Sequence, residues 1–352
     1  MNNFDSGWQD MYDAIYTFPE QLEKALIIGK NLSIDNKYTS IRNIVFVGMG
    51  GSAIGGDAIN TLIQDEIKIP FVVVRNYKIP NWANSSTLVI CSSYSGDTEE
   101  TLSAYGVALK QGCMVCGITT GGRLMQLLKS NKHDAMEIPG GYQPRAAIGF
   151  SFVPVLYFLH KIEIISHRLL TDVSDSVKYL KNIRECYTES NESNPTYQLA
   201  QKLYQLLPVI IGTANYSEVI ARRWKGQICE NAKMLAYHNE LPEMNHNDIE
   251  GWENNPDIVE KCIILWIKDK NDIDRNIIRQ KISNEVLAGL NVKQQIVTVE
   301  GTNPVIRFIH FIYFGDWLSL WCAQLHKTNP TTVKKISKLK TALLNYEDSE
   351  IS

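Results

Sequence analysis

Short apolar runs rich in β-branched residues recur through the first part of the chain and predict buried strands. These runs occupy residues 44–47, 71–74, 87–91 and 114–118. Stretches long enough to form helices separate the runs, and the clearest of them extends from Asp97 to Gln111. Strands that alternate with helices in this way predict a parallel sheet that is covered by helices on both faces.

The same pattern starts again after a polar segment. Residues 166–195 are polar and charged and end in NESNP, which predicts a connecting helix followed by a domain boundary. Further strands are predicted at 208–211, 262–267 and 295–299, and long helices at 217–236 and 305–325. The sequence therefore predicts an N-terminal half at 1–165, a linker at 166–195 and a C-terminal half at 196–352.

Length and composition agree with two globular halves. A chain of 352 residues exceeds the size at which one core usually keeps growing, so two domains are expected. The chain is 44% hydrophobic and 21% charged, with a net charge of -3, which does not favour a nucleic-acid partner. The first sixteen residues show no basic region followed by an apolar core, so the sequence predicts a cytoplasmic protein.

The longest apolar run is predicted to be a buried helix rather than a membrane span. Residues 305–325 include Arg307, His310 and Asp316, which are costly inside a bilayer. The sequence therefore predicts no membrane association for this segment.

Cysteine and histidine spacing predicts neither a metal site nor a disulfide framework. The seven cysteines are an odd number and mostly lie in apolar segments, as reduced core cysteines do. Cys113 and Cys116 form a CxxC inside a predicted strand, without a second pair at zinc-site spacing, so we expect a structural role for them. The histidines form neither H-x-H nor H-E-x-x-H, and no metal is expected.

A glycine-rich turn follows the first predicted strand. In GMGGSAIGGD, residues 48–57, the backbone N–H groups and the dipole of the helix that follows can receive an anion. The same turn also fits a variant of the dinucleotide-binding fingerprint. The next predicted strand is followed by Arg75 rather than by an acidic residue, which disfavours NAD and leaves NADP as an alternative.

A hydroxyl-rich loop follows the third predicted strand. SSYSGDTEET, residues 92–101, places the hydroxyls of Ser93, Ser95 and Thr98 around Gly96, just before a helix. Such a loop can hold a phosphate monoester without a lysine or a metal. Simple helix capping is the alternative interpretation, but capping alone does not require two serines and a glycine at these positions.

Two further segments contain candidate acid/base groups. ARRWKGQICENAK, residues 221–233, includes Glu230, and by itself such a run is usually a solvated helix face with salt bridges. LPEMNHNDIEGW, residues 241–252, places Glu243 and His246 on an irregular, Pro-containing loop. Catalytic groups lie on loops more often than on helix faces, which favours a functional interpretation of this region.

These motifs together resemble the bifunctional phosphoglucose/phosphomannose isomerases, which are built from two SIS (sugar isomerase) domains. The resemblance runs along most of the chain and depends on five segments: GMGGS at 48–52, SYSGDTEET at 93–101, PRAA at 144–147, KGQICENAK at 225–233 and LPEMNHNDIEGW at 241–252. It implies an α/β fold of two tandem SIS domains, each a doubly wound, mostly parallel sheet flanked by helices.

The resemblance also implies which residues contact the substrate. The implied contacts are Gly50, Gly51 and Ser52 at the sugar, and Ser93, Ser95 and Thr98 at the phosphate. Arg145 would lie beside the reacting carbons, and Glu230 would be the catalytic base. His246 would open the sugar ring from the neighbouring subunit of a homodimer, and Lys340 would assist that step. The family's threonine near C2 corresponds to Thr332 or is replaced by Val333, which makes mannose activity a weaker expectation than glucose activity.

The predicted activity is the interconversion of fructose 6-phosphate with glucose 6-phosphate and mannose 6-phosphate through a cis-enediolate, without a cofactor. A carboxylate shielded in a cleft can move a proton between adjacent carbons, an imidazole can open the ring, and a guanidinium can stabilise the enediolate. Four alternatives remain open: a non-catalytic phosphosugar sensor, an isomerase of another phosphosugar, an NADP-dependent oxidoreductase and a glucosamine-phosphate synthase half. The sensor is disfavoured because neither end shows a basic helix-turn-helix, and the synthase because its glutaminase domain is absent.

Overall fold

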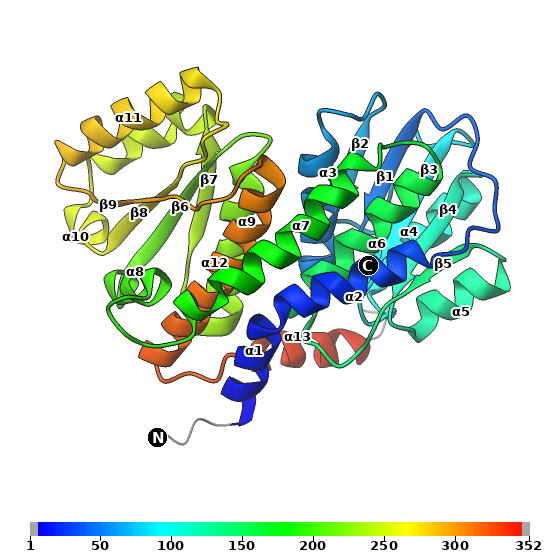
Figure 1. The fold of residues 1–352 in the computed structure, drawn as a ribbon, viewed down its shortest axis with the longest axis horizontal. Coiled ribbons are helices and arrows are strands. Elements are labelled where there is room, and N and C mark those ends of the chain that lie inside the picture. The colour runs from blue at the N-terminus through cyan, green and yellow to red at the C-terminus, as the bar shows by residue number, and fades with distance from the viewer. Residues whose placement is uncertain (1–5, 347–352) are drawn as a thin grey trace.

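Two parallel sheets organise the chain, as Figure 1 shows. The computed structural model describes residues 6–346, so residues 1–5 and 347–352, at the outer ends of the two predicted halves, lie outside it. The first sheet contains β1 (Asn43–Val47), β2 (Phe71–Val74), β3 (Thr87–Ser92), β4 (Met114–Thr119) and β5 (Asp134–Glu137). The second contains β6 (Leu207–Thr213), β7 (Tyr237–Leu241), β8 (Cys262–Ile267) and β9 (Lys293–Val297).

The strand orders match the doubly wound pattern expected from the sequence. The first sheet runs β2-β1-β3-β4-β5 and the second β7-β6-β8-β9, and every neighbouring pair is parallel. All residues of β3 and β8 are buried, as expected for apolar strands covered on both faces. The predicted α/β class is therefore confirmed.

Helices of more than two turns pack around both sheets. The longer helices are α1 (Ser6–Tyr16), α2 (Phe18–Lys30), α3 (Gly50–Ile63), α4 (Glu99–Lys110), α5 (Gly122–Ser130), α6 (Ile148–Lys161), α7 (Arg168–Ile183), α8 (Pro195–Leu203), α9 (Ser217–Gln227), α11 (Asp274–Ala288), α12 (Pro304–Leu325) and α13 (Lys334–Leu344). Shorter helical segments are η1 (Pro144–Ala146), η2 (Arg184–Tyr187), the π-helical η3 (Ile228–Ala232), η4 (Glu243–His246), η5 (Asp248–Trp252) and α10 (Pro256–Val259).

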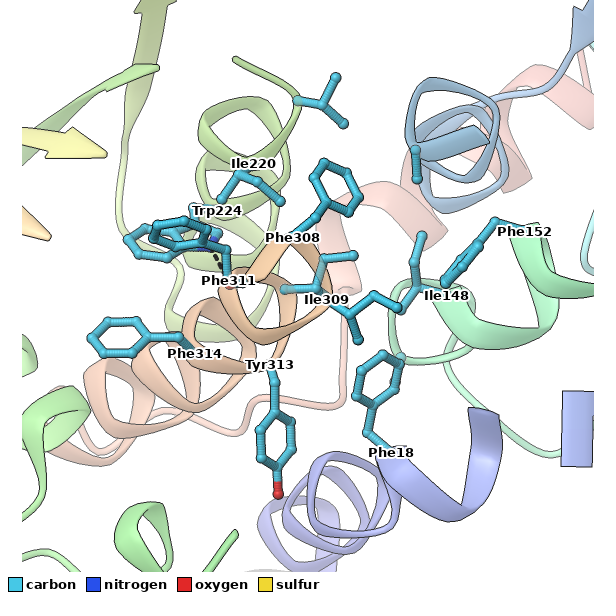
Figure 2. Close-up of a cluster of buried hydrophobic side chains, with 14 of the residues drawn as sticks. Phe18, Ile148, Phe152, Ile220, Trp224, Phe308, Ile309, Phe311, Tyr313 and Phe314 are labelled. Atoms are coloured by element: carbon cyan, nitrogen blue, oxygen red, sulfur yellow. Dashed lines mark hydrogen bonds between the residues drawn. The ribbon is translucent and has the colours of Figure 1, made fainter. Parts of the chain in front are cut away.

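Helix α12 lies between the two sheets and joins their cores. Figure 2 shows Phe308, Ile309 and Phe311 of α12 among side chains from α2, α6 and α9. The Trp224 indole N–H donates to the Phe311 carbonyl at 2.9 Å, and both rings are fully buried. Burying a large apolar side chain contributes about 1.5–3 kcal/mol, so this cluster is a major part of the folding free energy. The prediction of a buried helix here is confirmed, and no helix in residues 6–346 is long and apolar enough to cross a membrane.

The predicted linker is part of the packed structure. Helix α7 buries Leu169, Leu170, Val173, Val177 and Leu180, and packs against α2 and α12. Asn194 caps α8 by accepting from the backbone N–H groups of Thr196 and Tyr197. A helix does occupy the segment, as predicted, and the two sheets lie on either side of it along the chain. The domain limits at 165 and 195 stay a prediction.

Several predicted elements differ from the observed ones. The helix predicted at 217–236 is α-helical only to Gln227 and continues as the π-helical η3 to Ala232. Lys233 then takes a left-handed conformation with φ of 56°, which ends the helix. The strand predicted at 295–299 is β9, two residues earlier at Lys293–Val297. Strands β5 and β7 were not predicted, because DAME and YHNEL are not apolar runs.

Candidate active site

The glycine-rich turn links β1 to α3 and lies against the segment that contains Arg145. Helix α3 begins at Gly50, directly after β1 and the extended residue Met49. A Cβ atom on Gly51 would lie 2.8 Å from the Pro144 carbonyl oxygen, so only glycine fits at this contact. Ser52 is buried in the first turn of α3. The predicted sugar-binding turn and Arg145 are thus brought together by a close backbone approach.

The hydroxyl-rich loop is organised by Ser93. Its buried hydroxyl lies 2.8 Å from the Thr98 hydroxyl and accepts from the Gly96 backbone N–H at 3.0 Å. Thr98 occupies the N-cap position of α4, yet its side chain caps no backbone N–H of that helix. Ser95 is exposed and accepts from the Asp97 N–H at 3.2 Å. The loop therefore presents hydroxyls and the N-terminus of α4 at one place, as an anion site requires.

The two loops follow neighbouring strands at the point where the sheet reverses its order. β1 pairs with β2 on one side and with β3 on the other, and all three are parallel. In a doubly wound sheet, the crevice at the carboxyl ends of such strands is the usual ligand site. Residues 48–52 and 93–98 therefore lie next to each other at that crevice.

Gly96 is the position where substitution should disturb this loop most. Its φ is +77°, and a Cβ atom there would lie 1.9 Å from the Gly121 carbonyl oxygen. We expect Gly96→Ala to lower the free energy of unfolding by about 1–3 kcal/mol, because the backbone must leave a left-handed conformation and move away from Gly121. Chemical denaturation measures the change. Gly106→Ala is the matched control, because Gly106 lies in α4 with open space around it and should be neutral or stabilising.

Arg145 is buried and held by hydrogen bonds in several directions. Its side chain is only 4% exposed. The Nε–H donates to Asn231 Oδ1 at 2.6 Å, and Nη2 donates to the carbonyls of Pro330 and Thr331 at 2.6 and 2.9 Å. Burial lowers the pKa of Arg145, and the negative charge of Glu230 opposes that shift. The guanidinium is thus fixed in position before any ligand binds.

Glu230 lies within reach of this guanidinium. Its Oε2 is 3.4 Å from Arg145 Nη1, and its side chain is 32% exposed. Glu230 belongs to the π-helical segment η3, where one extra residue per turn changes the direction of the side chains. Asn231, the next residue, also contacts Arg145 through its Oδ1, and its Nδ2 donates to Ser319 Oγ at 2.9 Å. The structure therefore joins two predicted site residues, Arg145 and Glu230, that are far apart in the sequence.

The charged run before Glu230 is not a solvated face. Arg223 is buried, and its Nη2 donates to both Asp316 carboxylate oxygens at 2.8 Å and to the Arg145 carbonyl at 3.1 Å. Gln227 Nε2 donates to Asp316 Oδ1 at 2.7 Å. This network ties α9 to α12 and holds the backbone of Arg145. It was not predicted, because Asp316 was noted only as a charge within an apolar run.

Lys233 is a second residue that sequence reasoning missed. Its ammonium donates to the carbonyls of Glu230 at 2.6 Å and of Asn329 at 2.9 Å. Burial lowers the pKa of Lys233 to about 8, the charges of Arg145 and Lys335 act in the same direction, and Glu230 opposes them. Residues 329–331 therefore bind both Lys233 and Arg145, which fixes the end of the π-helical segment beside the guanidinium.

The other two predicted catalytic residues lie elsewhere on the chain. His246 is exposed at the end of η4, and its side chain forms no hydrogen bond or ion pair with any part of residues 6–346. Lys340 is exposed on α13, and its side chain forms no hydrogen bond or ion pair in the described part of the chain. Of the lysines on α13, Lys335 is the one whose charge acts on Lys233. The structure does not bring His246 or Lys340 to Glu230 within one chain.

Arg75, the residue that kept NADP binding as an alternative, forms an ion pair with Asp57. Arg75 Nη2 donates to Asp57 Oδ2, and Arg222 Nη1 contacts the same oxygen at 3.2 Å. Asp57 is buried on α3. The Arg75 charge is therefore used in contacts that join α3, β2 and α9, which disfavours a role in binding a ribose phosphate.

Comparison with known proteins decides the family. A family model for the bacterial phospho-glucose isomerase C-terminal SIS domain matches residues 192–343. The bifunctional phosphoglucose/phosphomannose isomerase of Caldicellulosiruptor bescii is 42% identical over 340 residues, which cover 96% of this chain and 100% of that protein. This chain belongs to the bifunctional phosphoglucose/phosphomannose isomerase family. The family member from Aquifex aeolicus is 34% identical over 339 residues, which cover 96% of this chain and 99% of the relative.

A solved structure supports the fold of this family member. A hypothetical protein from Thermus thermophilus aligns with a TM-score of 0.71 and 13% identity, covering 98% of this chain and 92% of that one. At this identity the similarity concerns the fold and carries no activity. The prediction of a tandem SIS architecture and the resemblance to the isomerase family are both confirmed.

Proposed function

We propose that the chain interconverts fructose 6-phosphate with glucose 6-phosphate and mannose 6-phosphate. The observation that carries the proposal is the contact of 3.4 Å between Glu230 and a buried, fixed Arg145. This pair lies beside the glycine turn, and the hydroxyl-rich loop follows the neighbouring strand. A base, a fixed cation and a phosphate cradle are the groups that aldose-ketose isomerisation needs.

Glu230 is proposed to move the proton between the two reacting carbons. It removes the proton from C2 of the aldose to form the enediolate and returns it to C1 to form the ketose. A proton passes between O1 and O2 in the same step, so atoms and charge balance. Arg145 stabilises the negative enediolate oxygens, and its bonds to the Pro330 and Thr331 carbonyls keep it in place throughout.

The loop at 93–98 is proposed to hold the substrate phosphate. Ser93, Ser95 and Thr98 supply hydroxyls, and the start of α4 supplies backbone N–H groups. Binding energy from the phosphate positions C1 and C2, so sugars without phosphate should react slowly. No metal and no cofactor enters this mechanism.

The active site is proposed to be shared between two chains of a homodimer. His246 would open the sugar ring of the partner's substrate, because it is exposed and unpaired in the described residues and lies in a segment that packs on β7 and η5. Helix α13 also offers an exposed apolar face, where Ile336, Leu339 and Leu343 are 40%, 60% and 54% exposed. A second copy covering this face would also bury part of the helix that contains Lys340. We place such an enzyme in the cytoplasm.

A coupled assay tests the activity. Purified protein is incubated with fructose 6-phosphate, and glucose 6-phosphate and mannose 6-phosphate are read separately. Formation of both sugars is the expected result. Formation of neither, with a correctly folded protein, rejects the isomerase and favours a phosphosugar sensor.

His246→Ala should impair cyclic substrates more than open-chain ones. The imidazole is assigned to ring opening, a step that an open-chain sugar does not need. We expect kcat/KM to fall by about 10²–10⁴-fold with cyclic fructose 6-phosphate, the range typical of a lost acid/base group. His167→Ala is the control, since His167 is exposed at the start of α7. Equal losses with both substrate forms would remove His246 from ring opening.

A further inference from the structure

A cavity of about 620 Å³ lies between the two halves, away from Glu230 and Arg145. One wall comes from the loops after β6 and β8, including Thr213, Tyr216 and Asp272. The opposite wall comes from the end of α3 at Thr61 and Leu62, and from the start of α7. Its volume is that of a small-molecule site.

The cavity and the proposed substrate site lie at equivalent positions of the two sheets. The substrate site lies at the first sheet, and the cavity lies at the second. In the order β7-β6-β8-β9, β6 takes the central position of β1 and β8 that of β3. The loops after β6 and β8 therefore flank the point where the strand order reverses, at the carboxyl ends of parallel strands. General rules for doubly wound sheets predict a ligand at such a point.

The chemistry of this second crevice disfavours phosphate. The loop after β8 contains Asp269 and Asp272 where the loop after β3 contains hydroxyls. Asp269 is neutralised by Arg307, whose Nε and Nη2 donate to it at 2.7 and 2.9 Å. Asp272 faces the cavity and accepts the Thr213 hydroxyl at 2.6 Å.

The other residues that line the cavity also disfavour phosphate. The carboxylates among the described lining residues are Asp65, Glu66, Asp172 and Asp272, against a single cation, Arg168. Their excess negative charge repels an anion and attracts hydroxyl and ammonium donors. Leu62, Tyr216 and Val305 add apolar surface next to these polar groups.

Asn276 adds a polar side chain to the cavity lining. Its side chain lines the cavity and the residue is only 9% exposed, yet in the described part of the chain its amide forms no hydrogen bond. The amide is therefore open to a ligand in the cavity, to which its N–H₂ can donate and its oxygen can accept.

We propose that this cavity binds a small hydroxyl-rich carbohydrate without phosphate, a free sugar or an amino sugar. The carboxylates accept hydrogen bonds from its hydroxyls or ammonium, and the Asn276 amide both donates and accepts. The apolar surface contacts the C–H face of the sugar ring. The site is separate from the proposed substrate site and does not depend on the isomerase activity.

Titration calorimetry with glucose and with glucosamine tests the proposal on the full-length protein. We expect each sugar to bind, and Asn276→Leu to weaken binding about tenfold, because it removes the amide and keeps the side-chain size. Tighter binding of glucosamine than of glucose identifies an amino sugar, and equal binding identifies the hydroxyls as the recognised groups. Asn284→Leu on the same helix is the control, since Asn284 donates to Gln294 at 3.0 Å and does not line the cavity.

A second variant keeps the test independent of folding. Asp65 is an exposed cavity residue, so Asp65→Asn should leave the fold intact and weaken glucosamine binding several-fold. Fructose 6-phosphate binding should be unchanged in both variants, which separates this cavity from the substrate site. Failure of both sugars to bind the wild-type protein, or unchanged sugar affinity in both variants, would overturn the proposal.

Discussion

Glu230→Gln is expected to bind fructose 6-phosphate as the wild type does and to lose about 10²–10⁴-fold in kcat. The amide keeps the size of the side chain but can neither take nor return a proton, and a positioned general base contributes a factor of this size. Isomer formation measures kcat, and the incorporation of solvent deuterium at C2 reports the proton transfer itself. Both should fall together.

Glu253→Gln is the matched control for this variant. Glu253 is an exposed glutamate of the same half, and the same substitution there should change neither rate. Near-normal turnover of Glu230→Gln would remove Glu230 from the role of base. Loss of substrate binding in that variant would instead assign Glu230 to positioning the sugar.

Arg145→Lys is expected to lower kcat by about 10²–10³-fold, as the loss of one donor to a developing oxyanion does. A lysine cannot reproduce the planar set of donors that reaches Asn231, Pro330 and Thr331 at once. At least one buried acceptor is then left unpaired, so we also expect the free energy of unfolding to fall by about 1–3 kcal/mol.

Steady-state kinetics and chemical denaturation measure the two effects of this variant separately. Arg275→Lys is the control, because Arg275 is exposed on α11 and should tolerate the change in both assays. A variant that is destabilised yet turns over normally would show that Arg145 supports the fold without acting on the enediolate.

The sequence predicted the sheet strands best where they are buried on both faces. The runs that form β3 and β8 are continuous, apolar and rich in β-branched residues, and both properties predict a buried strand. β7 reads YHNEL and packs at an edge of its sheet, where half-exposed polar residues give no apolar run. β5 and β7 are both edge strands with polar sequences, whereas the edge strands β2 and β9 contain enough apolar residues to be predicted.

The local motifs of the candidate site could be predicted from the sequence, but the contacts between residues far apart in the chain could not. The glycine turn and the hydroxyl-rich loop have local signatures, because their chemistry depends on neighbouring residues. The contact between Arg145 and Glu230 depends on residues far apart along the chain, and only the family resemblance suggested it. For the run that contains Arg223 and Lys233, a solvated helix face is the usual interpretation, since nothing local distinguishes an arginine that meets a buried Asp316 from one in water.

The central position of α12 means that neither half can be removed without damage to the other. α12 follows the second sheet in the chain, yet it packs against Phe18 and Ile148 of the first half (Figure 2). A fragment ending at residue 195 would leave these side chains in water and tend to aggregate. The two halves therefore share one core, and a truncation between them should destabilise both.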